Sequence, residues 1–205
     1  MHRWILVAAG AAATIALTAC TGSDAVDDPP IVDPGAPGDS PSPVPTEDLE
    51  EGEDDGHNEA DAEFMVQMIE HHKQALDMSE LAEDRADRDA IVSIAERIYD
   101  AQNAEIKAMQ GWVDSNVDDP QEYEIDHSEM PGMATPEEMA ELEDSSGDDF
   151  DRLFVDLMVT HHEGGVTMAE DVLIDGESDM ISSFASDVIA TQRGEIARMR
   201  DIIDD

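Results

Sequence analysis

Histidine and methionine recur at a fixed spacing in two separate stretches of the chain. His71-His72 and His161-His162 are each preceded by a methionine, Met68 or Met158, three positions before the first histidine. Imidazole binds copper, zinc, iron and nickel, whereas thioether sulfur is an unusual ligand except for copper(I) and silver(I). The combination predicts a site for a soft metal ion, with copper or silver favoured over zinc.

The two stretches belong to a longer internal repeat. Residues 61–110 align with residues 151–200 without a gap, at a period of ninety, which indicates duplication of one supersecondary unit. The histidines, several methionines and a Gln/Glu pair occur in both copies, although many of their neighbours differ. The candidate metal ligands in the repeats are His71, His72, His161, His162, Met68, Met78, Met109, Met158, Met168 and Met199. The candidate supporting residues are Gln102, Glu105, Gln192 and Glu195.

Each repeat is predicted to fold as two helices, which carry these candidate residues. In the first, apolar residues and His71 follow steps of four and three, the spacing of a heptad seam, and a second such seam ends near Met109. Asn58 with Asp61 predicts the start of the first helix, residues 84–89 a turn, and Gly111 the end of the second helix. Two such hairpins bury their seams against each other. The predicted fold class is therefore all-α, a four-helix bundle built from two αα-hairpins.

Folding the first hairpin about its turn places His71 opposite Gln102 and Glu105. The second hairpin likewise places His161 beside Gln192 and Glu195. His72 and His162 lie about 100° further around their helices, facing the other hairpin or solvent. This layer has two interpretations. It binds a metal ion, or its His, Gln and Glu side chains satisfy one another and only set the helix register.

The connector between the repeats holds further candidates. Thr135-Pro136-Glu137-Glu138 has the N-cap, N1 proline and N3 glutamate of a helix start, so we expect a short helix to about Glu143. Met130 and Met133 precede this helix, with His127 before them and Met139 after them. Met130 and Met133 are either additional metal ligands or apolar side chains that pack onto the bundle.

The N-terminal part predicts export and lipid anchoring. An apolar run from Trp4 to Leu17 is short for a membrane span and ends in Leu17-Thr18-Ala19-Cys20, the pattern of a lipoprotein cleavage site. Cys20 is the only cysteine and is predicted to be lipidated. We therefore expect a signal peptide over residues 1–19, a disordered acidic and proline-rich tether over residues 20–58, and the bundle over residues 59–203. The protein would then be attached to the extracytoplasmic face of the cell membrane.

Charge and motif content exclude other functions. A formal net charge of −42 opposes binding to nucleic acid and to anionic lipid. A ferritin-like di-iron centre needs Glu-x-x-His motifs, and Met68, Ile69, Met158 and Val159 stand where those glutamates would be. The chain shows no phosphate-binding glycine loop or catalytic triad, so we expect no catalytic residues and no enzyme activity.

The paired His-Met segments resemble those of a known family, the domain of unknown function 305. The resemblance covers roughly residues 59–203 and rests on three segments: residues 64–72, the Met130-Pro131-Gly132-Met133 connector and residues 150–169. It implies an exported, ferritin-like helical bundle that in some members binds copper or silver through His and Met. Lys73-Gln74-Ala75 departs from Glu163-Gly164-Gly165 in the second repeat, which predicts a more crowded or weaker first site.

Three functional hypotheses follow. The first is an extracytoplasmic copper(I) or silver(I) protein for buffering, resistance or delivery of the ion. The second is an interaction lipoprotein without metal, and the third is a redox enzyme that uses the same ligands. The sequence leaves open whether the halves make one shared site or two.

Overall fold

The computed structural model describes residues 32–33, 42–43, 56–123 and 130–204. The chain divides into two compact units, Met1–Glu50 and Glu51–Asp205. In the first unit, β1 (Val32–Asp33) pairs antiparallel with β2 (Ser42–Pro43). The sequence suggested no strand here, because two residues are too few to show an alternating pattern. Cys20, the whole of the expected signal peptide and most of the expected tether lie outside the described residues.

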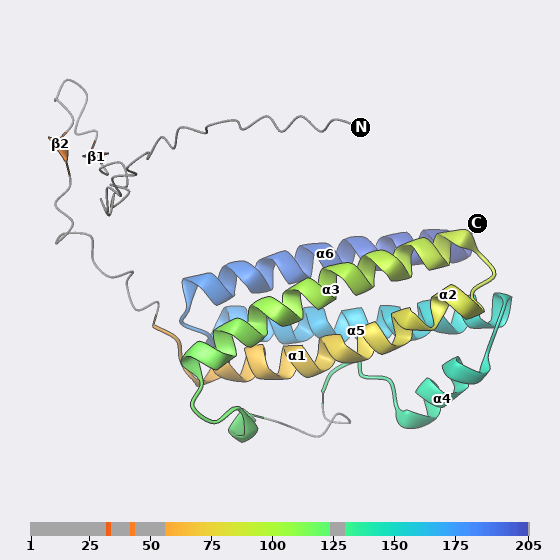
Figure 1. The fold of residues 1–205 in the computed structure, drawn as a ribbon, viewed down its shortest axis with the longest axis horizontal. Helices are drawn as coiled ribbons and strands as arrows, with labels where there is room; N and C mark the ends of the chain where they lie inside the picture. Colours follow the sequence, from red (N-terminus) through yellow and green to blue (C-terminus); the bar gives the residue numbers. More distant parts are fainter. Residues whose placement is uncertain (1–31, 34–41, 44–55, 124–129, 205) are drawn as a thin grey trace, which may run out of the picture. The chain divides into compact units, whose positions relative to one another are not determined.

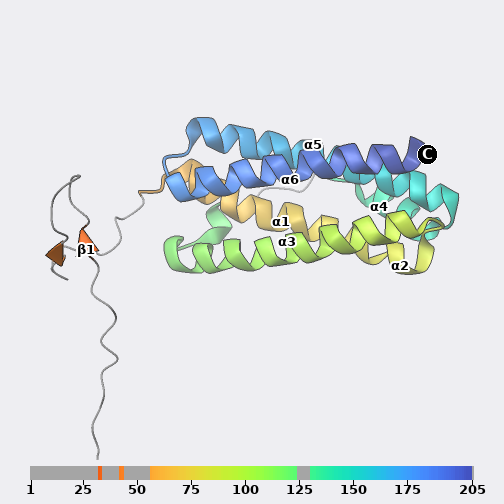
Figure 2. The same ribbon diagram turned by 90° about the horizontal axis from the view of Figure 1, so that it is seen from above.

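Four long helices form the second unit and lie lengthwise beside one another (Figures 1 and 2). They are α1 (Glu59–Glu80), α3 (Asp89–Asn116), α5 (Asp148–Asp175) and α6 (Asp179–Asp204). α1 pairs with α3, and α5 with α6, as two antiparallel hairpins that meet mainly through α1 and α5. The predicted bundle of two duplicated hairpins is present. None of the helices in the described ranges is both long enough and apolar enough to cross a bilayer.

The helix starts agree with the capping signals in the sequence. Asn58 accepts a hydrogen bond from the Asp61 amide, and the Asp61 carboxylate accepts one from the Asn58 amide. Thr135 and Glu138 form the same reciprocal arrangement at the start of α4 (Pro136–Asp144). A single turn of 3₁₀ helix, η1 (Pro120–Tyr123), lies in the connector before α4.

Two of the predicted helix boundaries were wrong. Residues 84–85, expected in a turn, belong to the short helix α2 (Ala82–Arg85). Gly111 does not end α3, which continues to Asn116. Val113 is buried four residues after buried Met109, so packing of this additional turn outweighs the low helix propensity of glycine.

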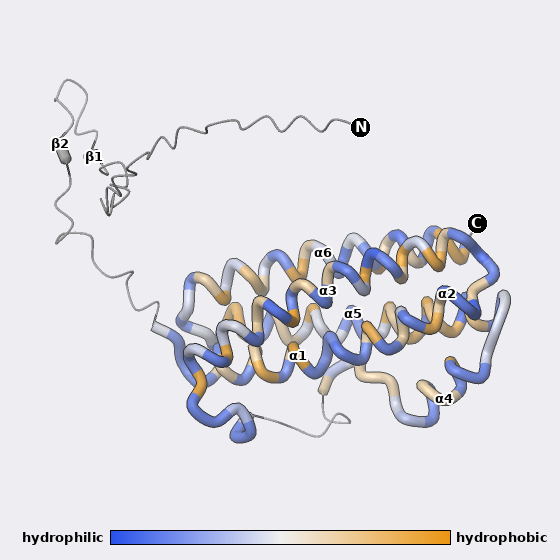
Figure 3. The backbone as a smooth tube through the Cα atoms, in the orientation of Figure 1, coloured by the Kyte–Doolittle hydropathy of each residue, from blue (hydrophilic) through white to orange (hydrophobic). Residues whose placement is uncertain are grey.

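The apolar core falls into two clusters, and each draws on both hairpins. Hydrophobic and hydrophilic segments alternate along the helices (Figure 3), as expected when each helix buries one face. One cluster includes Met68 and Met109 of the first hairpin with Met168 of the second. The other includes Met158 and Met199 of the second hairpin with Met78 of the first. A shift of ninety residues converts one trio into the other.

Candidate metal centre

The four repeat histidines lie at the middle of the bundle. His71 and His72 on α1, and His161 and His162 on α5, all have no exposed surface. The rings of His71 and His161 lie next to each other, with their centroids 3.8 Å apart and their planes tilted by 33°. Each lies more than 6 Å from the ring of its sequence neighbour. The sequence pairs therefore become one central pair, His71 with His161, flanked by two outer histidines.

Backbone carbonyls fix the protonation of the central pair. The Nε2 atom of His71 lies 3.1 Å from the Pro131 carbonyl oxygen, and that of His161 lies 2.9 Å from the His71 carbonyl oxygen. A carbonyl oxygen can only accept a hydrogen bond, so each Nε2 carries the hydrogen and donates it. In a neutral ring the lone pair is then on Nδ1.

Carboxylates hold the two outer histidines in the same way. His72 Nε2 lies 2.8 Å from a carboxylate oxygen of Glu105, and His162 Nε2 lies 2.8 Å from the equivalent oxygen of Glu195. The Glu195 side chain is 8% exposed and that of Glu105 is 27% exposed. All four histidines therefore use Nε2 to bond an oxygen, and each leaves Nδ1 facing the interior.

The four Nδ1 atoms are buried and have no hydrogen-bond partner in the described structure. The amide nitrogen and oxygen of Gln102 and Gln192 are also buried and unpartnered there. A buried polar atom without a partner is costly and points to a further ligand or water. Histidines that bind metals usually donate their second nitrogen to a carboxylate or a backbone carbonyl. The residues present therefore fit a metal ion held through Nδ1.

Burial keeps the central histidines neutral. The pKa of His71 is lowered to about 3, mainly by removal from water and also by the nearby His72 and His162, although the Pro131 carbonyl opposes the shift. Burial also lowers the pKa of His161, with contributions from the other three histidines. Only the neutral ring offers a lone pair to a metal ion, so both side chains are ready to bind one at neutral pH.

Sulfur ligands are needed to complete such a site. Within residues 56–123 and 130–204, no three His, Cys, Asp or Glu side chains come together to hold one metal ion. The six seam methionines are buried: Met68, Met78, Met109, Met158 and Met199 are 0% exposed and Met168 is 8% exposed. Met68 and Met158 lie one helical turn before the central histidines. The available donor set is therefore imidazole with thioether, the set that suits copper(I) and silver(I).

The connector crosses the two inner helices at the level of the central pair. The backbone of Pro131 and Gly132 lies against Gly164 of α5, where an added Cβ would come within 2.0 Å of the Pro131 carbonyl oxygen. On α1, Gln74 accepts from the Ala134 amide at 2.7 Å and donates to the Ala134 carbonyl at 2.9 Å. The connector thus explains why the two repeats differ at this position. Gly164 of α5 leaves room for the connector backbone, whereas Gln74 of α1 forms hydrogen bonds with it.

The connector methionines differ in burial. Met130 is 4% exposed, whereas Met133 and Met139 are half-buried. The burial of Met130 agrees with the interpretation that this side chain packs onto the bundle. His127, the other connector candidate, lies outside the described residues.

The predicted pairing within the histidine layer was wrong by one residue. His72 and His162, not His71 and His161, contact Glu105 and Glu195. The physical reason is that α1 and α5 each face two neighbours: the partner in their own hairpin and the other hairpin. The first histidine of each pair faces the other hairpin, and the second faces its own partner helix. The sequence marked Gln74 and Gly164 as a difference between the repeats but gave no partner for either, and it gave no role to the Pro131 carbonyl. Gln74 contacts Ala134 and His71 contacts Pro131, each across sixty residues of sequence.

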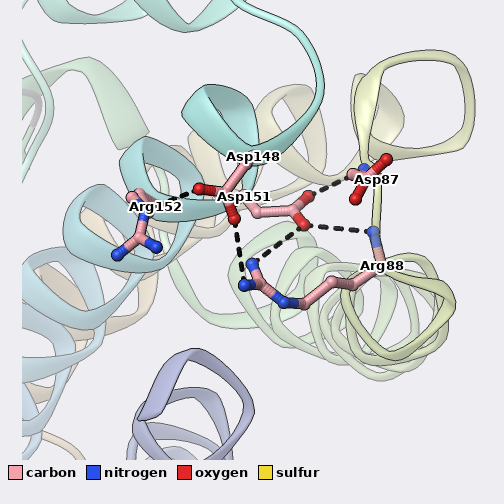
Figure 4. Close-up of polar contacts among 5 residues, drawn as sticks. All are labelled: Asp87, Arg88, Asp148, Asp151 and Arg152. Atoms are coloured by element: carbon pink, nitrogen blue, oxygen red, sulfur yellow. Dashed lines mark hydrogen bonds and ion pairs between the residues drawn. The ribbon is translucent and has the colours of Figure 1, made fainter. Parts of the chain in front are cut away.

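Two buried aspartates connect the two hairpins by hydrogen bonds, one at each end of the bundle. Asp151 of α5 accepts hydrogen bonds at 3.0 Å from the backbone amides of Asp87 and Arg88, and at 3.2 Å from the Arg88 guanidinium (Figure 4). Asp61 of α1 accepts from the amides of Glu177 and Ser178 at 2.9 and 3.1 Å. Each aspartate thus binds the turn of the opposite hairpin and helps to fix the histidine layer.

Comparison with known proteins identifies relatives of this bundle. The profile of the family described as "Domain of unknown function (DUF305)" matches residues 61–203. A DUF305 protein from Streptomyces coelicolor is 32% identical, with a TM-score of 0.60 and coverage of 70% of this chain and 91% of that chain. A DUF305 fragment from Deinococcus radiodurans is 29% identical, with a TM-score of 0.66 and coverage of 72% and 97%.

Solved structures of a protein named CopM are also similar. CopM in the Cu(I)-bound form is 28% identical, with a TM-score of 0.59 and coverage of 70% of this chain and 95% of that chain. CopM is also known in Ag-bound and Cu(II)-bound forms of similar likeness. No curated protein matches the chain significantly.

Proposed function

Because the chain belongs to the DUF305 family of domains of unknown function, we propose a function from its site: extracytoplasmic binding of copper(I) or silver(I), for buffering, resistance or delivery of the ion. The observation that carries the proposal is the set of four buried, unpartnered Nδ1 atoms in a core that also buries the seam methionines. The copper-bound and silver-bound forms of CopM support the choice of ions.

His71 and His161 are the proposed imidazole ligands of this site, together with the thioethers of Met68 and Met158. A soft ion bound there would supply the missing partners of the two Nδ1 lone pairs. The chain's own contribution is to hold each ring through Nε2 and to exclude water. Burial of both rings and both methionines meets the second requirement. The proposed role is binding without catalysis.

The outer histidines have a supporting role in the proposal. Their carboxylate partners Glu105 and Glu195 hold each ring in one orientation. The same contacts are also what a metal-free, register-setting layer would need. The experiment must therefore separate loss of a ligand from loss of packing.

Replacement of Met68 and Met158 by leucine makes this separation. Leucine keeps the volume and apolarity, so the fold should tolerate each change at less than about 1.5 kcal/mol. Leucine has no lone pair, so affinity for silver(I) or copper(I) in a competition titration should fall while affinity for zinc changes little. Met65→Leu is the matched control, because Met65 is equally buried on α1 but corresponds to Val155 in the second repeat.

Unchanged silver(I) affinity in the folded double variant would remove Met68 and Met158 from the site. The same test then applies to Met130 and Met133. If all four substitutions leave the affinity unchanged, the register-setting role replaces the proposal.

Attachment to the membrane is also part of the proposal. Cys20 follows Leu17-Thr18-Ala19 and is the proposed lipidation site. Lipidation there would leave the bundle on the extracytoplasmic face, at the end of a tether of about forty residues. Outside the cell, cysteine ligands are prone to oxidation, which makes methionine the practical soft ligand.

A further inference from the structure

Residues 130–134 of the connector form a strap over the central pair of histidines. Met130 and Ala134 at its two ends are 4% and 9% exposed, whereas Pro131 between them is exposed. The carbonyl oxygen of Pro131 accepts the hydrogen bond from His71, whose ring has no exposed surface. At this point a single layer of backbone therefore lies between His71 and solvent.

The strap is held in place differently from the helices around it. Residues 130–134 form neither helix nor strand, so their backbone lacks the repeated hydrogen bonds of α1 and α5. In the described structure the Gln74 side chain accepts from the Ala134 amide at 2.7 Å and donates to the Ala134 carbonyl at 2.9 Å. Gln74 is only half-buried, so water can compete for both bonds. We call these two bonds the clasp.

The α5 helix offers no equivalent side chain at the matching position. Gly132 of the strap has a φ of +77°, and an added Cβ there would come within 2.5 Å of the Thr160 carbonyl oxygen. Gly164, which corresponds to Gln74 of the first repeat, has no side chain that could bond the strap. The strap thus rests on the backbone of α5, and Gln74 ties its Ala134 end to α1.

Some part of the protein must move before an ion can reach the central pair, because neither ring has any exposed surface. The four long helices are held by two apolar clusters that each draw on both hairpins. Among residues 130–134, Ala134 alone belongs to either cluster, and it contributes only a methyl group. Opening the strap should therefore cost less free energy than separating the helices.

We propose that the strap is the gate through which a soft ion reaches His71 and His161, and that Gln74 keeps this gate closed. The inference rests on the proposed metal-binding function. Release of the clasp would let the strap move away from α1 and would break the bond between His71 and Pro131. The freed ring of His71 could then turn its Nδ1 atom toward the opening. Closure after binding would exclude water from the ion.

Acylation of His71 by diethyl pyrocarbonate, mapped by mass spectrometry, tests the gate in the metal-free protein. The reagent must reach the buried ring, so its rate follows opening of the strap. Gln74→Ala removes both bonds of the clasp and should raise the rate at His71 by at least about tenfold. His57 is exposed and serves as the internal standard, with the same rate in both proteins.

Stopped-flow mixing with silver(I) tests whether the ion uses this opening. In Gln74→Ala the association and dissociation rates should both rise by about tenfold, so that Kd changes by less than about twofold. A residue that only stabilised the bound ion would change the dissociation rate alone. Gln74→Glu can still accept from the Ala134 amide but cannot donate to its carbonyl, so it should show a smaller rise in both rates.

Gln67→Ala is the matched control. Gln67 is another glutamine of α1 that donates to the connector, but it does so at the Tyr123 carbonyl, outside the strap. Its replacement should change each rate by less than about twofold. Unchanged acylation of His71 in Gln74→Ala would overturn the gate, as would faster acylation without faster silver(I) association. A wild-type protein that binds neither silver(I) nor copper(I) would instead remove the proposed function, and the gate with it.

Discussion

His161 donates a hydrogen bond from Nε2 to the main-chain carbonyl oxygen of His71 at 2.9 Å, which joins equivalent positions of the two duplicated halves. The reciprocal bond is not made, because His71 donates to the Pro131 carbonyl of the connector instead. The connector therefore breaks the symmetry of the central pair. It gives the two rings different partners while leaving both Nδ1 atoms free for a metal ion.

Acid should destabilise the metal-free protein through the central histidines. The pKa of His71 is about 3 in the folded protein, against its usual 6.5. Between these values the unfolded chain binds a proton that the folded chain does not. Stability is therefore full above pH 6.5 and falls as the pH is lowered, by up to about 1.4 kcal/mol per pH unit and histidine.

Urea unfolding at pH 7, 6.5, 6, 5.5 and 5 measures this loss. A His71→Gln variant should be less stable at pH 7 but should lose less stability on acidification. His57→Gln, at an exposed position, is the control and should behave as wild type. Identical slopes for His71→Gln and wild type would contradict the prediction.

Alanine at Gly164 should displace the connector. Its Cβ would lie 2.0 Å from the Pro131 carbonyl oxygen, and backbone cannot give way as a flexible side chain can. We expect a loss of about 1–3 kcal/mol in the free energy of unfolding, together with altered silver(I) affinity.

Gly194→Ala is the matched control for Gly164→Ala. Gly194 lies in α6 with open space around its Cα, so alanine there should stabilise the helix by up to about 1 kcal/mol. If both variants change stability in the same direction, the connector does not depend on close approach at Gly164.

Asparagine at Asp61 or Asp151 should weaken the contacts between the hairpins. The substitution keeps the size of the side chain but removes the charge that accepts the turn amides. Each variant should lose about 2 kcal/mol or more in thermal or urea unfolding. The losses should add in the double variant, because the two contacts lie at opposite ends of the bundle. Asp171→Asn, at an exposed position, should have little effect.

Removal of the Cys20 thiol should abolish lipid attachment. Cys20→Ala leaves the bundle unaltered, so the variant should fold and bind silver(I) as the wild type does. Fractionation should find it in the soluble fraction, or uncleaved with its apolar leader. A variant that is processed normally and still partitions with membranes would show that Cys20 is not the anchor.

The sequence was sufficient to predict the four helices and their buried faces, but not the contacts among the histidines at the middle of the bundle. The heptad steps predicted burial of Phe64, Met68, His71, Ala75 and Met78, and all five are buried. Periodicity reports only that a residue faces the interior. It does not say which of two neighbouring helices the residue meets. For this reason the predicted partner of His71 was Glu105, which in the structure contacts His72.

The connector contacts had no signal in the periodic pattern. Gln74 reaches Ala134 across sixty residues, and the pattern treats Gln74 as an ordinary polar position. The one available indication was the difference between Gln74 and Gly164 in otherwise matching repeats. Such a difference shows that the two halves have unlike neighbours, although it does not identify them.

The exchange of methionines between the two core clusters has an evolutionary consequence. Neither hairpin alone holds a complete trio, because Met168 joins Met68 and Met109, and Met78 joins Met158 and Met199. A single ancestral hairpin of this design would have completed its core only by pairing with a second copy, as an isologous homodimer. The neighbouring rings of His71 and His161 would then have faced each other across the twofold axis of that dimer. Fusion of two such copies would make the pair permanent, and the linker between them would allow one face of the axis to diverge from the other.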